Sequence, residues 1–173
     1  MTIPNAQRGS GMLEFSLALA LTASIGAGLF SVAGLLEQRR QAGQTLDLIH
    51  RASALARRQL PLQPDGYASL STASIAGLVP ANRVIWSGGE VAGLRTPLNR
   101  PLRALGNGPF AFWIRLSELT RQECRTLLPQ TWRDYSRIKL NDAVVKSQTH
   151  ASFPQPLLDQ CAARGNVLDV EGS

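Results

Sequence analysis

The sequence has few of the residues from which catalytic and metal sites are built. Among its 173 residues there are only two histidines and two cysteines. Neither His50 nor His150 lies in a metal-ligand or nucleophile motif, and the sequence shows no phosphate-binding glycine loop and no zinc-ligand spacing. His50, beside Arg51 in an amphipathic segment, is explained as a solvated or packing side chain. We therefore expect no enzymatic activity, no cofactor and no metal site.

Charge is missing from a long stretch near the N-terminus. From Phe15 to Leu36 no residue is charged, and a helix rising ~1.5 Å per residue over this stretch spans about 33 Å, enough to cross a hydrocarbon core of about 30 Å. A secretory signal has a shorter apolar region followed by a small-residue cleavage site, whereas this run continues into a helical pattern. We predict a retained membrane-spanning segment. The basic residues on its two sides do not fix its orientation by the positive-inside rule.

Glu14 is the one carboxylate at the entrance of this apolar run. A carboxylate drawn toward the centre of a membrane costs about 3 kcal/mol and is usually functional and paired. The alternative is a harmless position at the level of the lipid headgroups.

Gly9, followed five residues later by Glu14 and then by an unbroken apolar helix, resembles the class III signal of type IV pilins, which prepilin peptidase cuts on the cytoplasmic side of the apolar run. The resemblance implies cleavage between Gly9 and Ser10 and N-methylation of Ser10. It also implies that Glu14 is the assembly carboxylate, which pairs with the N-terminal amine of an adjacent subunit. Gly11 is a competing cleavage site, but it places the carboxylate only three residues into the mature chain.

The length leaves room for the membrane segment and one domain of ordinary size. We predict three parts: a cytoplasmic leader over residues 1–9, a transmembrane or filament-core helix over residues 10–36, and a globular head domain over residues 37–173. The head begins with an amphipathic helix over residues 37–60, because polar and basic residues lie on one side and apolar residues recur at spacings of three and four on the other. These apolar positions are Leu46, Ile49, Ala52, Ala56 and Leu60. Pro61 ends the helix, which we expect to run from near Ser10 to Leu60.

The remainder of the chain alternates short strands with short helices. Residues 67–79 are predicted as a short helix or an irregular loop, residues 96–109 as a Pro- and Gly-rich loop, and residues 110–116 as the best strand. Thr120 and Glu123 form a capping box for a short helix that Pro129 ends. Further strands are expected at 83–86, 91–94, 138–140, 143–145 and 167–170, with a turn at Asn141-Asp142 and another helix at 156–163 ended by Gly165. This order predicts an α+β fold.

The two cysteines, Cys124 and Cys161, both fall on these short helices. An even number of cysteines in an exported domain favours a disulfide, and closing a loop of this length contributes about 4 kcal/mol in the loop-entropy model. Two buried free thiols are an alternative, and a metal pair lacks the further ligands that it needs.

The order of strand, cysteine-bearing helix, hairpin, second cysteine-bearing helix and final strand is similar to that of type IVb major pilins, such as those of toxin-coregulated and conjugative thin pili. The resemblance implies a pilin fold, in which a long N-terminal helix packs on an antiparallel sheet. It also implies a Cys124–Cys161 disulfide that encloses a variable surface region.

Three classes of function follow. The first is a subunit that self-polymerises into a pilus for adhesion, aggregation or conjugation. Its partners are prepilin peptidase and the pilus assembly machinery, and it lies in the inner membrane, with the head in the periplasm, before it enters the extracellular filament. The second is a minor pilin or a type II secretion pseudopilin. The third is a membrane-anchored periplasmic domain that does not polymerise. We favour the first because the size suits a repeated subunit.

The net charge of +6 favours anionic partners, and all but one of the basic residues follow Leu36. We expect the arginines of the 37–60 helix to pair with acidic groups between subunits; these are Arg39, Arg40, Arg51, Arg57 and Arg58. The exposed candidates for binding are Arg133, Arg137, Lys139, Lys146 and Arg164. Repeated along a filament, such charges form a multivalent surface. We hypothesise salt-sensitive adhesion to anionic surfaces or DNA; the alternative is that the charges keep the fibre soluble.

Overall fold

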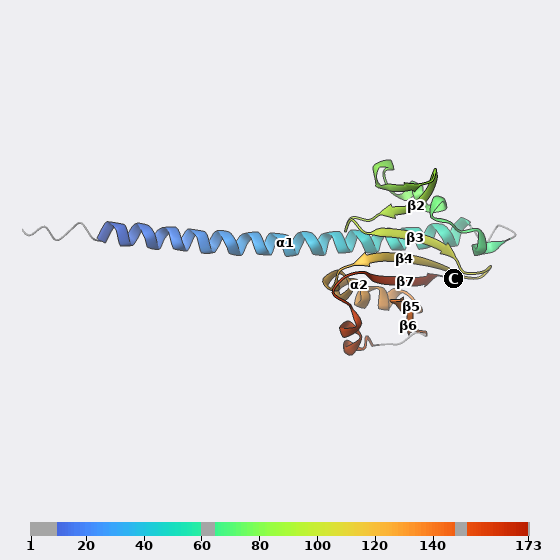
Figure 1. Ribbon diagram of the computed structural model, residues 1–173. Helices are drawn as coiled ribbons and strands as arrows, with labels where there is room; N and C mark the ends of the chain where they lie inside the picture. Colours follow the sequence, from blue (N-terminus) through green and yellow to red (C-terminus); the bar gives the residue numbers. More distant parts are fainter. Residues whose placement is uncertain (1–9, 60–64, 148–151, 173) are drawn as a thin grey trace, which may run out of the picture. The chain divides into compact units, whose positions relative to one another are not determined.

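The computed structural model describes the backbone of residues 10–59, 65–147 and 152–172 (Figure 1), and the side chains of residues 34–58, 65–147 and 152–172. The chain divides into two compact units, Met1–Arg39 and Arg40–Ser173. Helix α1 (Ser10–Gln59) supplies the regular structure of the first unit and the first element of the second. Most of the apolar run over residues 15–36 lies outside the described side chains, and no helix among the residues that were described is long and apolar enough to cross a membrane.

The second half of α1 buries the apolar stripe that its sequence predicts. Leu46, Ile49, Ala52 and Ala56 are all buried, with Ala52 fully inaccessible. The described part of the helix reaches Gln59, and the proline at position 61 that was predicted to end it lies outside the described residues. The last predicted member of the stripe, Leu60, lies outside the described residues.

Seven strands form one antiparallel sheet in the order β1-β2-β3-β4-β7-β5-β6 (Figure 1). The strands are β1 (Val84–Ser87), β2 (Glu90–Arg95), β3 (Pro101–Gly106), β4 (Phe112–Leu119), β5 (Arg137–Leu140), β6 (Ala143–Lys146) and β7 (Asn166–Gly172). The first four strands are neighbours in sequence and in space. Strand β7 lies between β4 and β5 and pairs with both, so it joins the β5–β6 hairpin to the rest of the sheet.

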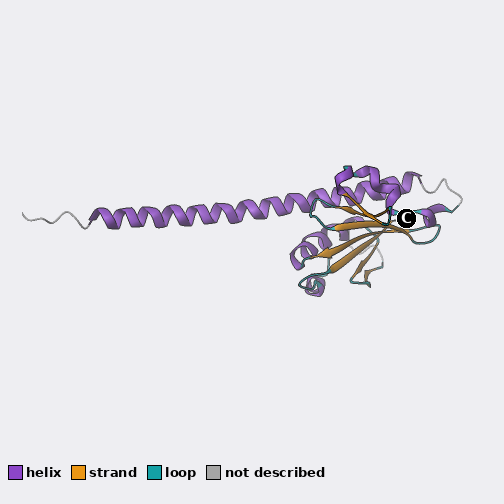
Figure 2. Ribbon diagram, turned by 45° about the horizontal axis from the view of Figure 1, so that its top comes forward, coloured by secondary structure: helices purple, strands orange, loops and turns teal. Residues whose placement is uncertain are grey.

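Alternation along the strands gives the sheet an apolar inner face and a charged outer face. In β4 the side chains of Phe112, Ile114 and Leu116 enter the core, while Trp113 and Arg115 point to the other face. The core is closed by the second half of α1 and by helix α2 (Arg121–Asp134), whose Leu127 and Leu128 are fully buried. Figure 2 shows these helical segments beside the strands of the sheet.

The remaining helical segments are short 3-10 turns. Two of them are η1 (Gly66–Ser69) and η2 (Thr72–Leu78). They lie in the segment over residues 67–79, which was predicted as either a short helix or an irregular loop. A third, η3 (Ala81–Arg83), leads into β1. The predicted helix over residues 156–163 is instead a 3-10 turn, η4 (Gln155–Gln160), which follows Pro154 and is capped by Cys161.

Two further predictions were wrong in the middle of the chain. The predicted loop over residues 96–109 contains strand β3, which begins at Pro101, a position where a strand tolerates proline. Pro129 does not end α2 but lies inside it, and the helix continues to Asp134 because Thr131 and Trp132 are buried beyond the proline. Packing of an apolar face thus outweighs the backbone hydrogen bond that proline removes.

Candidate functional site

The predicted processing and assembly residues lie where side chains are not described. Gly9 lies outside the described residues. Ser10 is the first residue of α1 and Glu14 lies one turn later, and both belong to the part of α1 described by its backbone alone. Their roles in cleavage, methylation and assembly stay predictions.

The disulfide predicted between Cys124 and Cys161 is present. The two Cα atoms are 6.0 Å apart, and both residues are 1% exposed. The bond joins the first turns of α2 to the end of η4 and encloses residues 124–161, which we call the disulfide-bounded region. This region holds most of α2, the β5–β6 hairpin and η4. The alternatives of two free thiols and of a metal pair are therefore excluded.

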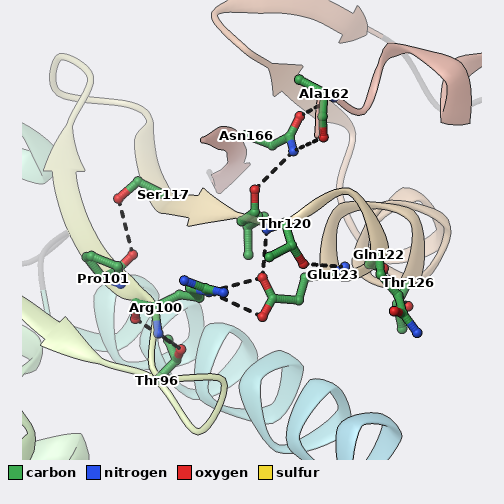
Figure 3. Close-up of polar contacts among 11 residues, drawn as sticks. Thr96, Arg100, Pro101, Ser117, Thr120, Gln122, Glu123, Thr126, Ala162 and Asn166 are labelled. Carbon is green, nitrogen blue, oxygen red and sulfur yellow. Dashed lines mark hydrogen bonds and ion pairs between the residues drawn. The ribbon is translucent and has the colours of Figure 1, made fainter. Parts of the chain in front are cut away.

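A capping box fixes the start of α2 just before Cys124 (Figure 3). The Thr120 hydroxyl accepts a hydrogen bond of 3.3 Å from the Glu123 N–H, and the Glu123 carboxylate accepts one of 2.7 Å from the Thr120 N–H. The guanidinium of Arg100, from the loop before β3, donates to both oxygens of this carboxylate at 3.2 and 3.0 Å. The sequence predicts the capping box, but not the arginine that neutralises its buried carboxylate.

Asn166 links the segment that follows Cys161 to the sheet through hydrogen bonds of its side chain (Figure 3). Its Nδ2 donates to the carbonyl oxygens of Leu119 and Ala162, at 3.0 and 2.8 Å, and its Oδ1 accepts from the Ala162 N–H at 2.7 Å. The side chain is fully buried, so each of these bonds replaces a lost contact with water. The Asn166 Oδ1 also accepts a hydrogen bond of 3.3 Å from the Asn141 Nδ2. Nothing in the sequence marked Asn166, because its partners are brought together by folding.

An open groove of about 340 Å³ lies between α1 and the end of α2 and is lined by His50, Ser53, Arg57, Asp134 and Tyr135. The His50 Nε2 lies 3.1 Å from an Asp134 oxygen, and the Ser53 hydroxyl lies 3.0 Å from the Tyr135 hydroxyl. Burial raises the pKa of Tyr135, against the lowering effect of its hydrogen bond with Ser53. Because the serine bonds to the tyrosine and not to the histidine, this groove does not contain a serine nucleophile paired with a base.

The structure corrects the set of cations expected to be exposed. Arg133, Arg137 and Arg164 are exposed and Lys139 is half-buried, whereas Lys146 is only 3% exposed. The prediction for Lys146 was wrong because its ammonium group donates to the carbonyl oxygens of Trp132 and Tyr135 at the end of α2. Burial lowers the pKa of Lys146. Of the helix arginines predicted to pair between subunits, Arg51 is bound at 2.7 Å to Asp47 of its own helix.

Comparison with known proteins gives one line of evidence on identity. No protein-family model matches the sequence, and no curated protein matches it. Among solved structures, the chain is similar to TcpA, a type IV pilin from Vibrio cholerae El Tor biotype, with a TM-score of 0.51 and 14% sequence identity. The match covers 79% of this chain and 99% of that chain. The chain has the pilin fold.

The pilin fold accounts for the arrangement of the described elements: a long N-terminal helix, an antiparallel sheet packed on its second half, and a disulfide near the C-terminal strand. It confirms the resemblance on which the sequence-based prediction rested. It does so through geometry, since 14% identity leaves almost no sequence signal in common.

Proposed function

We propose that the chain is the structural subunit of a type IV pilus of the IVb type. It is inserted in the inner membrane with its head in the periplasm, is cleaved by prepilin peptidase between Gly9 and Ser10, and is polymerised by the pilus assembly machinery into an extracellular filament. The observation that carries this proposal is the pilin fold of the chain, in which a long N-terminal helix packs on an antiparallel sheet. The IVb assignment rests on the order of the elements around the disulfide.

The physical basis of assembly is the apolar run over residues 15–36. In the membrane its side chains are sheltered by lipid, and in a filament each run contacts the same run of neighbouring subunits, so that burial from water is kept when the helix leaves the bilayer. Glu14 then needs a partner in a dry environment, which the amine of Ser10 from an adjacent subunit supplies. At about 4 Å and an effective dielectric constant of 20, such a pair attracts by ~4 kcal/mol, comparable to the cost of placing the carboxylate there.

The decisive experiment combines processing with filament purification. Gly9→Ala is expected to leave full-length precursor in the membrane and to abolish filaments, whereas Gly11→Ala, the matched control, is processed normally. Intact-mass analysis of sheared wild-type filaments is expected to give a chain that begins at Ser10 as the main protein. A chain beginning at Met1 or Met12 refutes the cleavage site. A filament in which this chain is a trace component identifies it as a minor pilin or pseudopilin.

A further inference from the structure

The outer face of the sheet carries a concentrated array of cations. By strand alternation this face bears Trp113 and Arg115 of β4, and directly opposite residues on neighbouring strands share it. Its basic residues are Arg95, Arg103, Arg115, Arg137 and Lys139. We call this surface the outer sheet face. It is distinct from the surface of α1 and α2, which cover the opposite, apolar face.

In two ion pairs of the outer sheet face the acid is more deeply buried than the arginine that it binds. The Asp169 carboxylate accepts two hydrogen bonds of 2.8 Å from Arg115, yet its side chain is 2% exposed while that of Arg115 is 36% exposed. Glu171 and Arg137 repeat the pattern, with exposures of 16% and 45%. A ligand that approaches these two pairs therefore meets the guanidinium groups before Asp169 and Glu171, whereas Asp142, which lies 3.2 Å from Arg115, is an exposed carboxylate with 79% of its side chain accessible.

Arg103 is a cation of this face that has no acidic partner among the described residues. Arg103 of β3 is exposed and lies directly opposite Arg115 of β4, an arrangement of like charges that destabilises a sheet. Asp169 and Asp142 compensate Arg115, but Arg103 forms no ion pair with any residue that the structure describes. Like charges on directly opposite residues lower the stability of the sheet, and such a cost is expected where residues serve a function.

Trp113 holds two further cations in place. The Lys139 Nζ lies 4.3 Å from the centre of the Trp113 ring, and the Arg137 Cζ lies 5.8 Å from a ring centre of the same residue. These cation–π contacts restrict the two side chains without neutralising them. The indole is only 8% exposed, so it cannot act as a stacking platform for an unpaired base.

We propose that the outer sheet face binds the phosphate backbone of double-stranded DNA. Arginine matches phosphate through its planar fork of donors, and guanidiniums fixed by Asp169 and Trp113 suit a rigid polyanion with regular phosphate spacing. The covered indole favours a duplex over single strands, and binding is expected to be independent of base sequence because contacts to phosphates carry no sequence information. The inference does not rest on the proposed function, because the unassembled chain presents the same face.

The test uses the full chain in micelles of a neutral detergent and a fluorescent duplex of about 30 base pairs, with binding followed by anisotropy. With about three phosphates contacted, raising the salt from about 50 to 200 mM is expected to weaken binding about 40-fold. Replacing Arg103 and Lys139 together by glutamine removes two of these contacts, so affinity falls at low salt and the remaining salt effect shrinks to about fourfold. Circular dichroism verifies the fold of each variant.

The matched control replaces Arg58 and Arg133, two exposed arginines on α1 and α2, by glutamine, and so changes the net charge equally. It is expected to bind DNA within about twofold of the wild type. An equal loss in both double variants means diffuse attraction and overturns the proposal, as does absence of binding at low salt. A polyglutamate peptide of matching charge that competes as well as unlabelled duplex also overturns it, in favour of an acidic protein partner. Failure of filament formation in the Gly9→Ala strain leaves this measurement unaffected.

Discussion

Lys146 lies against the C-terminal end of helix α2, where its ammonium group donates a hydrogen bond of 2.6 Å to the carbonyl oxygen of Tyr135. A second bond goes to the carbonyl oxygen of Trp132, and the Nζ lies 5.2 Å from the centre of the Trp132 ring. The last carbonyls of a helix have no partner within the helix. A residue of strand β6 therefore caps α2 and ties the edge of the sheet to the helix inside the disulfide-bounded region.

The first prediction concerns this cap. Lys146→Met keeps the volume of the side chain but leaves two carbonyl groups without a donor, and it is expected to lower the free energy of unfolding by about 2 kcal/mol. Arg133→Met, which removes an exposed cation from the same helix, is expected to change it by less than about 0.5 kcal/mol. Urea denaturation of both variants measures the difference. Equal effects of the two substitutions show that Lys146 does not cap the helix.

The second prediction concerns alkaline pH. Because burial raises the pKa of Tyr135 above its usual value near 10, the unfolded phenol loses its proton first. Above pH 10 the folded state then binds more protons, and stability falls as pH rises. The wild type is expected to be about 1 kcal/mol more stable than Tyr135→Phe near pH 8, because of the bond with Ser53, and this advantage is lost above pH 10.

The titration itself has a direct readout. The sequence contains two tyrosines, so Tyr67→Phe leaves Tyr135 as the sole phenol. Its ionisation, followed by absorbance near 295 nm, is expected above pH 10 in the folded protein and near pH 10 in urea. The same midpoint in both states contradicts the burial argument.

The third prediction separates the charge of Glu123 from its hydrogen bonds. Glu123→Ala removes the capping box and leaves Arg100 unpaired in a largely buried place, and it is expected to cost about 3 kcal/mol or more. Glu123→Gln keeps an acceptor for the Thr120 N–H and is expected to cost less. Glu118→Gln, an exposed change nearby, serves as the control with almost no cost. Thermal unfolding ranks the three variants, and a cost for Glu123→Gln equal to that of the alanine variant indicates that the ion pair with Arg100 dominates.

The fourth prediction concerns the disulfide. Alkylation without reduction is expected to label neither Cys124 nor Cys161. The double alanine variant is expected to lose about 4 kcal/mol of stability, because it frees a closed loop with a sequence separation of 37 residues. Mass spectrometry detects the label, and denaturation measures the loss. Labelling of both thiols in folded protein disproves the bond.

The fifth prediction concerns assembly. Glu14→Ala is expected to insert and to be processed normally but to assemble poorly, because in the proposed filament the carboxylate pairs with the amine of a neighbouring subunit. Glu14→Asp is expected to be intermediate, since its charge is kept and its reach is shorter by one methylene. Filament yield after shearing, normalised to mature protein in the membrane, is the measurement. A normal yield from Glu14→Ala removes the assembly role.

Local patterns in the sequence predicted the elements that local interactions determine. The stripe from Leu46 to Ala56, the capping box of Thr120 and Glu123, and the β5–β6 hairpin all appear as expected. The hairpin turn places both Asn141 and Asp142 at positive φ, a conformation that these two residue types tolerate. In each case the pattern that predicts the element lies within a short stretch of sequence.

The features that sequence reasoning missed are set by distant segments. The sequence did not predict strand β3, because Pro101 and Gly106 at its two ends are residues typical of loops. Gly106 is required at its position, since an added Cβ would lie 2.3 Å from the Tyr67 carbonyl oxygen. The burial of Lys146 depends on the end of α2, and the layering of Arg115 over Asp169 depends on the register between β4 and β7. The partners of these contacts lie on different elements, 11 residues apart for Lys146 and Tyr135 and 54 residues apart for Arg115 and Asp169.

The position of β7 also has a consequence for biogenesis. A ribosome that has not passed residue 166 has made β1–β4 and the β5–β6 hairpin, but not the strand that joins them. Until then the chain holds two partial sheets, and β4 and β5 each present an unpaired edge of the kind that recruits other chains. Cys124 and Cys161 both precede this strand. Formation of the Cys124–Cys161 disulfide can therefore link α2 to the end of η4 before β7 is made, and so restrain the two partial sheets before the strand that joins them is present.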